Sequence, residues 1–217
     1  ASAIIPSINF AKKLSENGIQ LSSANSINIG RLVPQIAYYV YAYVKLLESG
    51  DIAAGEKINV CVPTGNFGNI LAAYCAKRMG LPLGKLLCAS NDNKVLTDFF
   101  RTGIYDKNRP FHVTTSPSMD ILISSNLERL LYFAGENAEE CKKLMEELKD
   151  KGKYRISDAM EKELKDFYSG YGKEAEGSQS IFQTYKETGY VLDPHTAVAK
   201  VVADHYAYEQ GRRDKCL

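Results

Sequence analysis

Residues 58–80 constrain the fold of this chain most, because a strand pattern passes through a short polar turn directly into a helix pattern. Val60-Cys61-Val62, preceded by Ile58, is a short apolar run of the kind found in strands that are buried on both faces. Residues 70–79 are rich in Ala and Leu, and Gly80 stands where a C-terminal glycine is expected. The stretch therefore predicts a buried strand, a tight turn and a helix.

The turn, Thr64-Gly65-Asn66-Phe67-Gly68-Asn69, predicts a phosphate-binding site. A strand that turns into a helix points several backbone N–H groups, and the positive end of the helix, at one spot. The glycines let the backbone approach an anion closely, and Thr64, Asn66 and Asn69 can add side-chain donors. An ordinary turn, in which Gly and Asn serve only the backbone, fits the same spacing. The dinucleotide fingerprint and the nucleotide P-loop are both absent here, which disfavours NAD and ATP.

Composition excludes several classes of function. The 217 residues, 45% of them hydrophobic, suffice for one large domain or one domain with an appendage. Charged residues make up 24% and the formal net charge is +1, so neither nucleic-acid nor membrane-surface binding is predicted. No apolar run approaches the roughly 20 residues of a membrane span, and the N-terminus lacks the features of a signal peptide.

The cysteines and histidines predict neither a disulfide framework nor a metal site. No C-x-x-C pair occurs among the five cysteines, which are widely separated: Cys61, Cys75, Cys88, Cys141 and Cys216. Buried thiols in a reducing compartment are the better interpretation, and we expect a cytoplasmic protein. The three histidines are also scattered along the sequence, so no metal is expected.

A second apolar run, Lys85-Leu86-Leu87-Cys88-Ala89-Ser90, completes a strand–helix–strand unit with the first. Such a unit implies a parallel sheet. Asn91-Asp92-Asn93 follows at the carboxyl end of the second strand, the edge at which open α/β sheets bind ligands. These polar residues either form a turn and a helix cap or contact a ligand.

Two further polar groups leave the same two alternatives open. Asn25, Ser26 and Asn28 precede a helical pattern over residues 29–47, with Pro34 expected in its first regular turn. They are caps or ligand contacts. Asp193 and Pro194 predict a helix start, where His195 and Thr196 either complete the cap or meet an anion.

Between these groups, residues 111–114 read as a strand, and residues 115–120 as a polar loop. Ser125-Asn126-Leu127-Glu128 predicts a capping box that opens a helix, and Asn126 is either beside the cap or in contact with a ligand. Residues 135–177 are rich in Glu and Lys, and we interpret them as a charged helical insertion with a loop at 169–172. The expected organisation is an α/β core over residues 1–134, the insertion over 135–177, and a return to the core over 178–217.

Five motifs that occur in order make the chain resemble threonine synthase, of the branch shared by many bacteria and fungi. The resemblance covers most of residues 19–134 and 178–217. The motifs are Asn25-Ser26-Ile27-Asn28, Val62-Pro63-Thr64-Gly65-Asn66-Phe67-Gly68-Asn69, Ser90-Asn91-Asp92-Asn93, Ser118-Met119-Asp120 and Asp193-Pro194-His195-Thr196-Ala197-Val198.

This resemblance implies the large domain of a fold-type II enzyme that uses pyridoxal 5'-phosphate (PLP), a three-layer αβα domain with a mostly parallel sheet. It implies a lyase of threonine biosynthesis that converts O-phospho-L-homoserine and water to L-threonine and phosphate. The cofactor phosphate would be held by Gly65, Asn66, Phe67, Gly68 and Asn69, beside Thr64. Contacts to cofactor or substrate would come from Asn25, Ser26, Asn28, Asn91, Asn93, Ser118 and Asp120.

Family members also need a lysine that forms the Schiff base with PLP and transfers protons. In the family it lies in a Phe-Lys-Asp segment of the smaller N-terminal domain, and no such segment precedes Gly65. Leu164-Lys165-Asp166-Phe167 follows the turn, in a charged stretch where the lysine would stay solvated, so we reject it. A C-terminal Thr-Ala-x-Pro-x-Lys-Phe motif is also absent. We therefore expect a piece of the larger domain, without a catalytic residue and inactive without the N-terminal domain of the same protein.

Two alternatives remain open at the level of the sequence. One is another fold-type II PLP lyase, acting on a different phosphorylated or β-substituted amino acid. The other is a non-catalytic module that uses the same turn to bind a phosphorylated metabolite.

Overall fold

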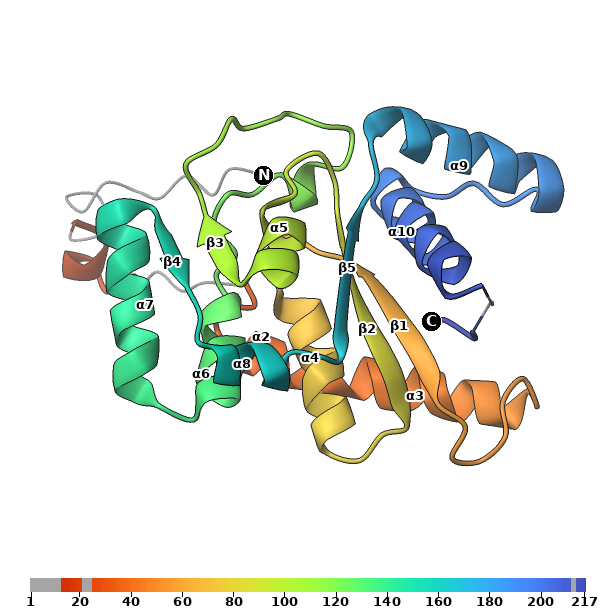
Figure 1. Ribbon diagram of the computed structural model, residues 1–217, viewed down its shortest axis with the longest axis horizontal. Helices are drawn as coiled ribbons and strands as arrows, with labels where there is room; N and C mark the ends of the chain where they lie inside the picture. Colours follow the sequence, from red (N-terminus) through yellow and green to blue (C-terminus); the bar gives the residue numbers. More distant parts are fainter. Residues whose placement is uncertain (1–12, 21–24, 212–213) are drawn as a thin grey trace.

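A parallel sheet of three strands in the order β1-β2-β5 forms the centre of the protein (Figure 1). The strands are β1 (Ile58–Pro63), β2 (Leu83–Ser90) and β5 (Phe167–Tyr171). The computed structural model describes residues 13–20, 25–211 and 214–217. Helix α4 (Gly68–Arg78) connects β1 to β2, whose register places Val62 opposite Cys88. The predicted strand–turn–helix–strand unit is thus confirmed.

Helices cover both faces of this sheet, which confirms the predicted three-layer α/β class. On one face, Val60, Val62 and Leu86 join the main core together with Leu71 of α4 and Phe99 of α5 (Val95–Thr102). On the other face, a smaller cluster joins strand residues to α10 (Pro194–Gln210) through Ala89, Ala199 and Val202. Helix α9 (Glu174–Thr188) packs on α10, at the edge of the molecule (Figure 1).

The helical pattern ahead of β1 is divided at Pro34, close to the predicted position. Helix α2 (Ile29–Leu32) passes through a 3-10 turn, η1 (Val33–Gln35), into α3 (Ile36–Glu48). Pro34 lies in the first turn of η1, where its missing N–H costs no helical hydrogen bond. Helix α3 packs against α4, and the Tyr39 hydroxyl donates to Oδ1 of Asn69 at 2.5 Å. Burial raises the pKa of Tyr39.

The prediction of a loop at residues 169–172 is wrong, because residues 167–171 form β5 in the central sheet. Small residues are required there by close packing on both faces. A Cβ at Gly170 would lie 2.9 Å from a methyl of Val202, and Ser169 Oγ donates to the carbonyl of Thr97 at 3.1 Å. The strand therefore lacks the apolar alternation by which strands are identified in a sequence.

The rest of residues 135–177 is partly helical, as expected. It follows α6 (Leu127–Gly135) and contains α7 (Ala138–Lys151) and α8 (Asp158–Glu163). Between them β4 (Lys153–Arg155) pairs antiparallel with β3 (Ile104–Asp106), and the rings of Tyr105 and Tyr154 stack at 5.3 Å. None of the helices in the described ranges is both long and apolar enough to span a membrane.

Candidate phosphate site at the start of helix α4

The turn between β1 and α4 opens onto a hollow of about 240 Å³. The walls come from segments that are far apart in the sequence. Gln35 comes from η1, Ser26 from the segment ahead of α2, and Ser118 from a 3-10 turn, η2 (Pro117–Met119). The remaining lining residues belong to β1, the turn and the first residues of α4: Val62, Pro63, Thr64, Gly65, Asn66, Phe67, Gly68, Asn69 and Ile70.

Consecutive backbone amides are available for an anion in this turn. Among the residues that the structure describes, none accepts a hydrogen bond from the backbone N–H groups of residues 65–69. The Thr64 amide, directly before the run, donates to the Ala89 carbonyl, and the Leu71 amide, two residues after it, donates to the Phe67 carbonyl. Unpaired amides at the first turn of an 11-residue helix carry partial positive charge. Amides and hollow together fit a phosphate group.

Phe67 fixes the conformation of the turn. It adopts φ +64°, a left-handed conformation that is unfavourable for a bulky residue. Its ring is buried in the core, with ring centroids 5.9 Å from Phe100 and 5.8 Å from Phe167. Because the side chain is buried in the core, Phe67 can contact an anion only through its backbone N–H.

The two glycines of the turn allow neighbouring segments to approach closely. A Cβ on Gly65 would lie 2.2 Å from the carbonyl oxygen of Ser118, and one on Gly68 would lie 2.2 Å from Ser26 Oγ. Real Cβ atoms do not come so close to another atom. The glycines were expected to make room for an anion, whereas in the structure they make room for the segments that form the walls.

Asn126 connects the turn to the segment ahead of α2. Its side-chain amide donates to the Asn66 carbonyl at 2.8 Å and to Ser26 Oγ at 3.0 Å. The predicted capping box is wrong, because Asn126 is the N-cap residue of α6 without a side-chain cap bond. The long-range contact uses the side-chain amide instead. Within the described residues, Ser125 Oγ is buried without a hydrogen-bond partner.

Arg129 belongs to the same connection and was not predicted. Its guanidinium donates to the carbonyls of Ser26 at 3.1 Å and Ile27 at 2.6 Å, and it also contacts the Asn126 side chain. The only signal in the sequence is its position three residues after Asn126, on the same face of the helix. Of the three polar residues predicted near this end, Ser26 alone lines the hollow. Asn28 caps α2 by accepting from Gly30 N at 2.9 Å, and Asn25 accepts from Ile27 N at 3.2 Å.

Asn91, Asn93 and Asp120 form a buried polar network beside the hollow. Asp120 Oδ1 accepts from the side-chain amides of Asn91 at 2.7 Å and Asn93 at 2.9 Å, and from Thr114 Oγ1 at 2.8 Å. Asn93 also exchanges hydrogen bonds with the backbone of His112. These predicted contact residues do not line the hollow, and they hold the 112–120 segment against the end of β2.

The prediction of a strand at residues 111–114 is therefore wrong. These residues have no ladder partner, and their backbone bonds go to side chains of the network: His112 N donates to Asn93 and Thr114 N to Asp120 Oδ2.

Asp120→Asn is expected to lower the free energy of unfolding by about 1–3 kcal/mol, because one carboxylate oxygen becomes an amide that faces other donors. Urea unfolding of the two proteins measures the difference. Asp92→Asn, in the same polar cluster of the sequence, is the matched control and should leave stability within about 0.5 kcal/mol of the wild type. An equally small effect of Asp120→Asn would contradict the network.

Helix α10 begins as predicted, with Asp193 as N-cap and Pro194 in the first turn. Thr196 does not line the hollow; its hydroxyl donates to Asp193 Oδ2 at 2.5 Å. His195 contacts Asp193 Oδ1 through Nδ1 at 2.9 Å, and its Nε2 accepts from the Ser118 amide at 3.2 Å. The cap is thereby joined to the wall of the hollow.

Asp193→Ala is expected to lower stability by about 1 kcal/mol at neutral pH through loss of the cap. Hydrogen bonds from the Thr196 hydroxyl and from His195 lower the pKa of Asp193 to about 2. A carboxyl with a lowered folded-state pKa stabilises the fold above its unfolded pKa, and this contribution is lost as pH falls through the folded value. The stability difference between wild type and variant should therefore shrink between about pH 4 and pH 2. Urea unfolding across this range measures it, and a constant difference would contradict the assignment.

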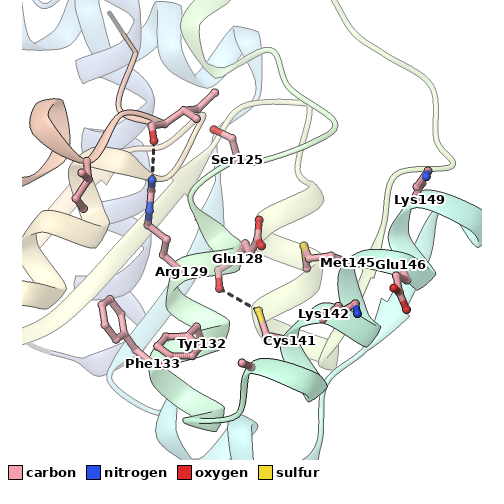
Figure 2. A pocket seen from close by; sticks show the side chains of 13 residues that line it. Ser125, Glu128, Arg129, Tyr132, Phe133, Cys141, Lys142, Met145, Glu146 and Lys149 are labelled. Carbon is pink, nitrogen blue, oxygen red and sulfur yellow. Dashed lines mark hydrogen bonds between the residues drawn. The ribbon is translucent and has the colours of Figure 1, made fainter. Parts of the chain in front are cut away.

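A larger hollow of about 790 Å³ lies between α6 and α7 (Figure 2). Its lining is mainly apolar, with Tyr132, Phe133 and Met145, and Arg129 lies at one end. Cys141 faces it, but burial raises the pKa of this thiol, so it is a poor nucleophile at neutral pH. In the part of the chain that the structure describes, the lining of this larger hollow has no run of unpaired amides like that of residues 65–69, so the smaller hollow is the candidate phosphate site.

Comparison with known proteins shows which proteins the chain resembles. No protein-family model matches the chain. It is 52% identical over 192 residues to threonine synthase-like 1 of Homo sapiens, covering 87% of this chain and 26% of that protein. It is 39% identical over 193 residues to the threonine synthase of Saccharomyces cerevisiae, covering 82% and 37%. The chain thus spans about a quarter to two fifths of the relatives it matches.

Solved structures give the same result. A PLP-bound threonine synthase from Brucella melitensis superposes with a TM-score of 0.82 at 41% identity, over 92% of this chain and 41% of that one. A yeast threonine synthase superposes with a TM-score of 0.83 at 35% identity, over 91% and 41%. Sequence and fold therefore correspond to one segment of these proteins.

Proposed function

We propose that this chain, which is homologous to one segment of the threonine synthases, supplies the binding site for the phosphate of PLP. The observation that carries the proposal is the run of unpaired amides at residues 65–69, facing a hollow of about 240 Å³. A PLP-bound relative of the same fold supports it. When bound, PLP supplies an electron sink for chemistry at an amino acid substrate.

The residues around the hollow would orient the phosphate rather than react. The backbone N–H groups of residues 65–69 donate to its oxygens, and the start of α4 adds partial positive charge. Thr64 is not free to donate, because its hydroxyl already donates to the Val62 carbonyl at 2.7 Å. Asn69 is held by Tyr39 and Gln35, which fixes the last amide of the run.

The finer proposal concerns the whole protein. It is a PLP-dependent lyase that converts O-phospho-L-homoserine and water to L-threonine and phosphate in the cytoplasm. The Schiff-base lysine would come from an N-terminal domain, since no Phe-Lys-Asp segment precedes Gly65 in this chain. The chain alone would then bind the cofactor phosphate without turnover.

Binding without this reaction is the second candidate. Identity is 52% to a relative whose name, threonine synthase-like 1, states no reaction, against 39% to the yeast threonine synthase, so the names of the relatives leave this candidate open. Release of phosphate from O-phospho-L-homoserine by the longer protein separates the two candidates. Turnover supports the lyase, and PLP binding without turnover supports the binding protein or a lyase with another substrate.

Calorimetry with pyridoxamine 5'-phosphate and pyridoxamine tests the site in this chain. Neither compound forms a Schiff base with a lysine, and only the first carries a phosphate. We expect the phosphate to raise the affinity by at least about tenfold, which corresponds to about 1.4 kcal/mol. Equal affinities would contradict the proposed site.

A further inference from the structure

Two anchors hold the η2 turn against the phosphate site. Asp120, just after the turn, is fixed by the network with Asn91 and Asn93 at the end of β2. Ser118, within the turn, is fixed by His195 at the start of α10. The anchors come from different elements, and the Asp120 anchor does not involve His195.

The position of Ser118 determines the shape of the hollow. Ser118 is one of the lining residues, and its carbonyl oxygen lies so close to Gly65 that a Cβ there would be 2.2 Å away. Met119, the next residue, is buried in the core. A displacement of Ser118 would therefore move the wall that faces the first amide of the run.

The contact between Ser118 and His195 requires one form of the imidazole. A backbone amide can only donate, so Nε2 must be unprotonated to accept from Ser118 at 3.2 Å. Nδ1 then carries the proton and donates it to Asp193 Oδ1 at 2.9 Å. Asp193 thus caps α10 and selects the ring tautomer that can hold Ser118.

We propose that His195 is a positioning residue for the phosphate site: its neutral ring holds Ser118 against Gly65, and protonation at Nε2 releases the turn. This inference rests on the proposed function. It predicts that anion affinity falls as His195 becomes protonated, because Nε2 becomes a donor that faces the Ser118 donor. The sequence left open whether His195 completes the cap or contacts an anion; in the structure it contacts Asp193 and Ser118.

Three acidic groups near this contact keep their partners when His195 is protonated. Asp193 accepts from Nδ1 in both protonation states. Glu174, at the start of α9, accepts from the Thr115 amide at 3.3 Å and anchors the segment from a third side. Asp120 is occupied by its network. Protonation of the His195 ring therefore removes the Ser118–His195 hydrogen bond and leaves the hydrogen bonds of these acidic groups in place.

Long-range ¹H–¹⁵N NMR correlation of the His195 ring tests the geometry without any ligand. In the neutral ring, we expect Nδ1 to carry the proton and Nε2 to have the chemical shift of an unprotonated nitrogen. Protonated Nε2 with unprotonated Nδ1 would overturn the proposal, because that ring cannot accept from Ser118.

Sulfate titration followed by amide shifts of residues 65–69 tests the consequence. Sulfate keeps its charge between about pH 5 and 8, so a change in affinity over this range comes from the protein. We expect affinity to fall by about 2- to 10-fold along the titration curve of His195, the range expected for one lost hydrogen bond. His195→Leu should have the low affinity at every pH, and His195→Gln, which keeps an acceptor, should have higher affinity and no dependence on ring protonation.

His205→Gln is the matched control, because His205 lies on the same helix and contacts Glu176 at 3.6 Å instead. It should keep the wild-type profile. If the wild-type protein bound sulfate equally well or more tightly when His195 is protonated, the proposed role of His195 would be overturned, while the phosphate site would stand. No shift of residues 65–69 at any pH would contradict the phosphate site itself, and this role with it.

Discussion

Phe67→Ala is expected to lower the free energy of unfolding by about 3–5 kcal/mol, the range for truncating a buried aromatic ring. The ring is 1% exposed and packs against Phe100 and Phe167, so its removal leaves a cavity where the turn joins the core. The turn also loses the anchor that keeps residue 67 at φ +64°. We therefore expect anion binding to weaken together with stability.

Urea unfolding measures the first effect, and sulfate titration under conditions where the variant remains folded measures the second. Phe182→Ala is the matched control, since Phe182 is 62% exposed on α9. It should change stability by no more than about 0.5 kcal/mol. If Phe67→Ala lowered the free energy of unfolding by no more than this control, the ring would not anchor the turn.

Gly65→Ala is expected to reduce anion affinity by at least about tenfold. The added Cβ would lie 2.2 Å from a backbone oxygen of Ser118, and backbone cannot rotate away as a side chain can. The η2 turn would have to move, against the hold of His195 and Asp120. At Gly68 the obstacle is the Ser26 side chain, so Gly68→Ala should have the milder effect, and a bulky residue there should abolish binding.

Gly177→Ala supplies the control for this series. Its Cβ would lie 3.9 Å from Val198, an ordinary contact, and alanine favours the helix by about 0.5–1 kcal/mol. We expect this variant to bind sulfate like the wild type and to be slightly more stable. If Gly65→Ala bound sulfate as tightly as the wild type in the same titration, the close approach of Ser118 to the turn would be contradicted.

Local signals in the sequence predicted the elements that carry the site. The apolar run at Val60-Cys61-Val62 and the helix formers after residue 69 specify a strand and a helix by neighbours alone, as do the Asp193 cap and Pro34. Each depends on residues a few positions apart, which is the range over which propensity and capping act.

Long-range contacts account for what the sequence did not predict. A glycine is needed at position 170 of strand β5 because Val202 of α10 packs closely against it. The residues next to Gly170 in the sequence give no sign of this contact. Asn126 bonds to Asn66, 60 residues away, instead of capping its own helix. Asn91 and Asn93 were recognised as polar residues at a strand end, but a turn, a cap, a ligand contact and a buried network use the same side chains.

The central claim is that the amides of residues 65–69 bind a phosphate ester. Backbone ¹H–¹⁵N spectra, recorded while pyridoxamine 5'-phosphate is added, test it most directly, with pyridoxamine as the blank. We predict that the largest shifts fall on residues 65–69, saturate together and are absent with the blank. Saturating shifts elsewhere, with these amides unchanged, would contradict the account.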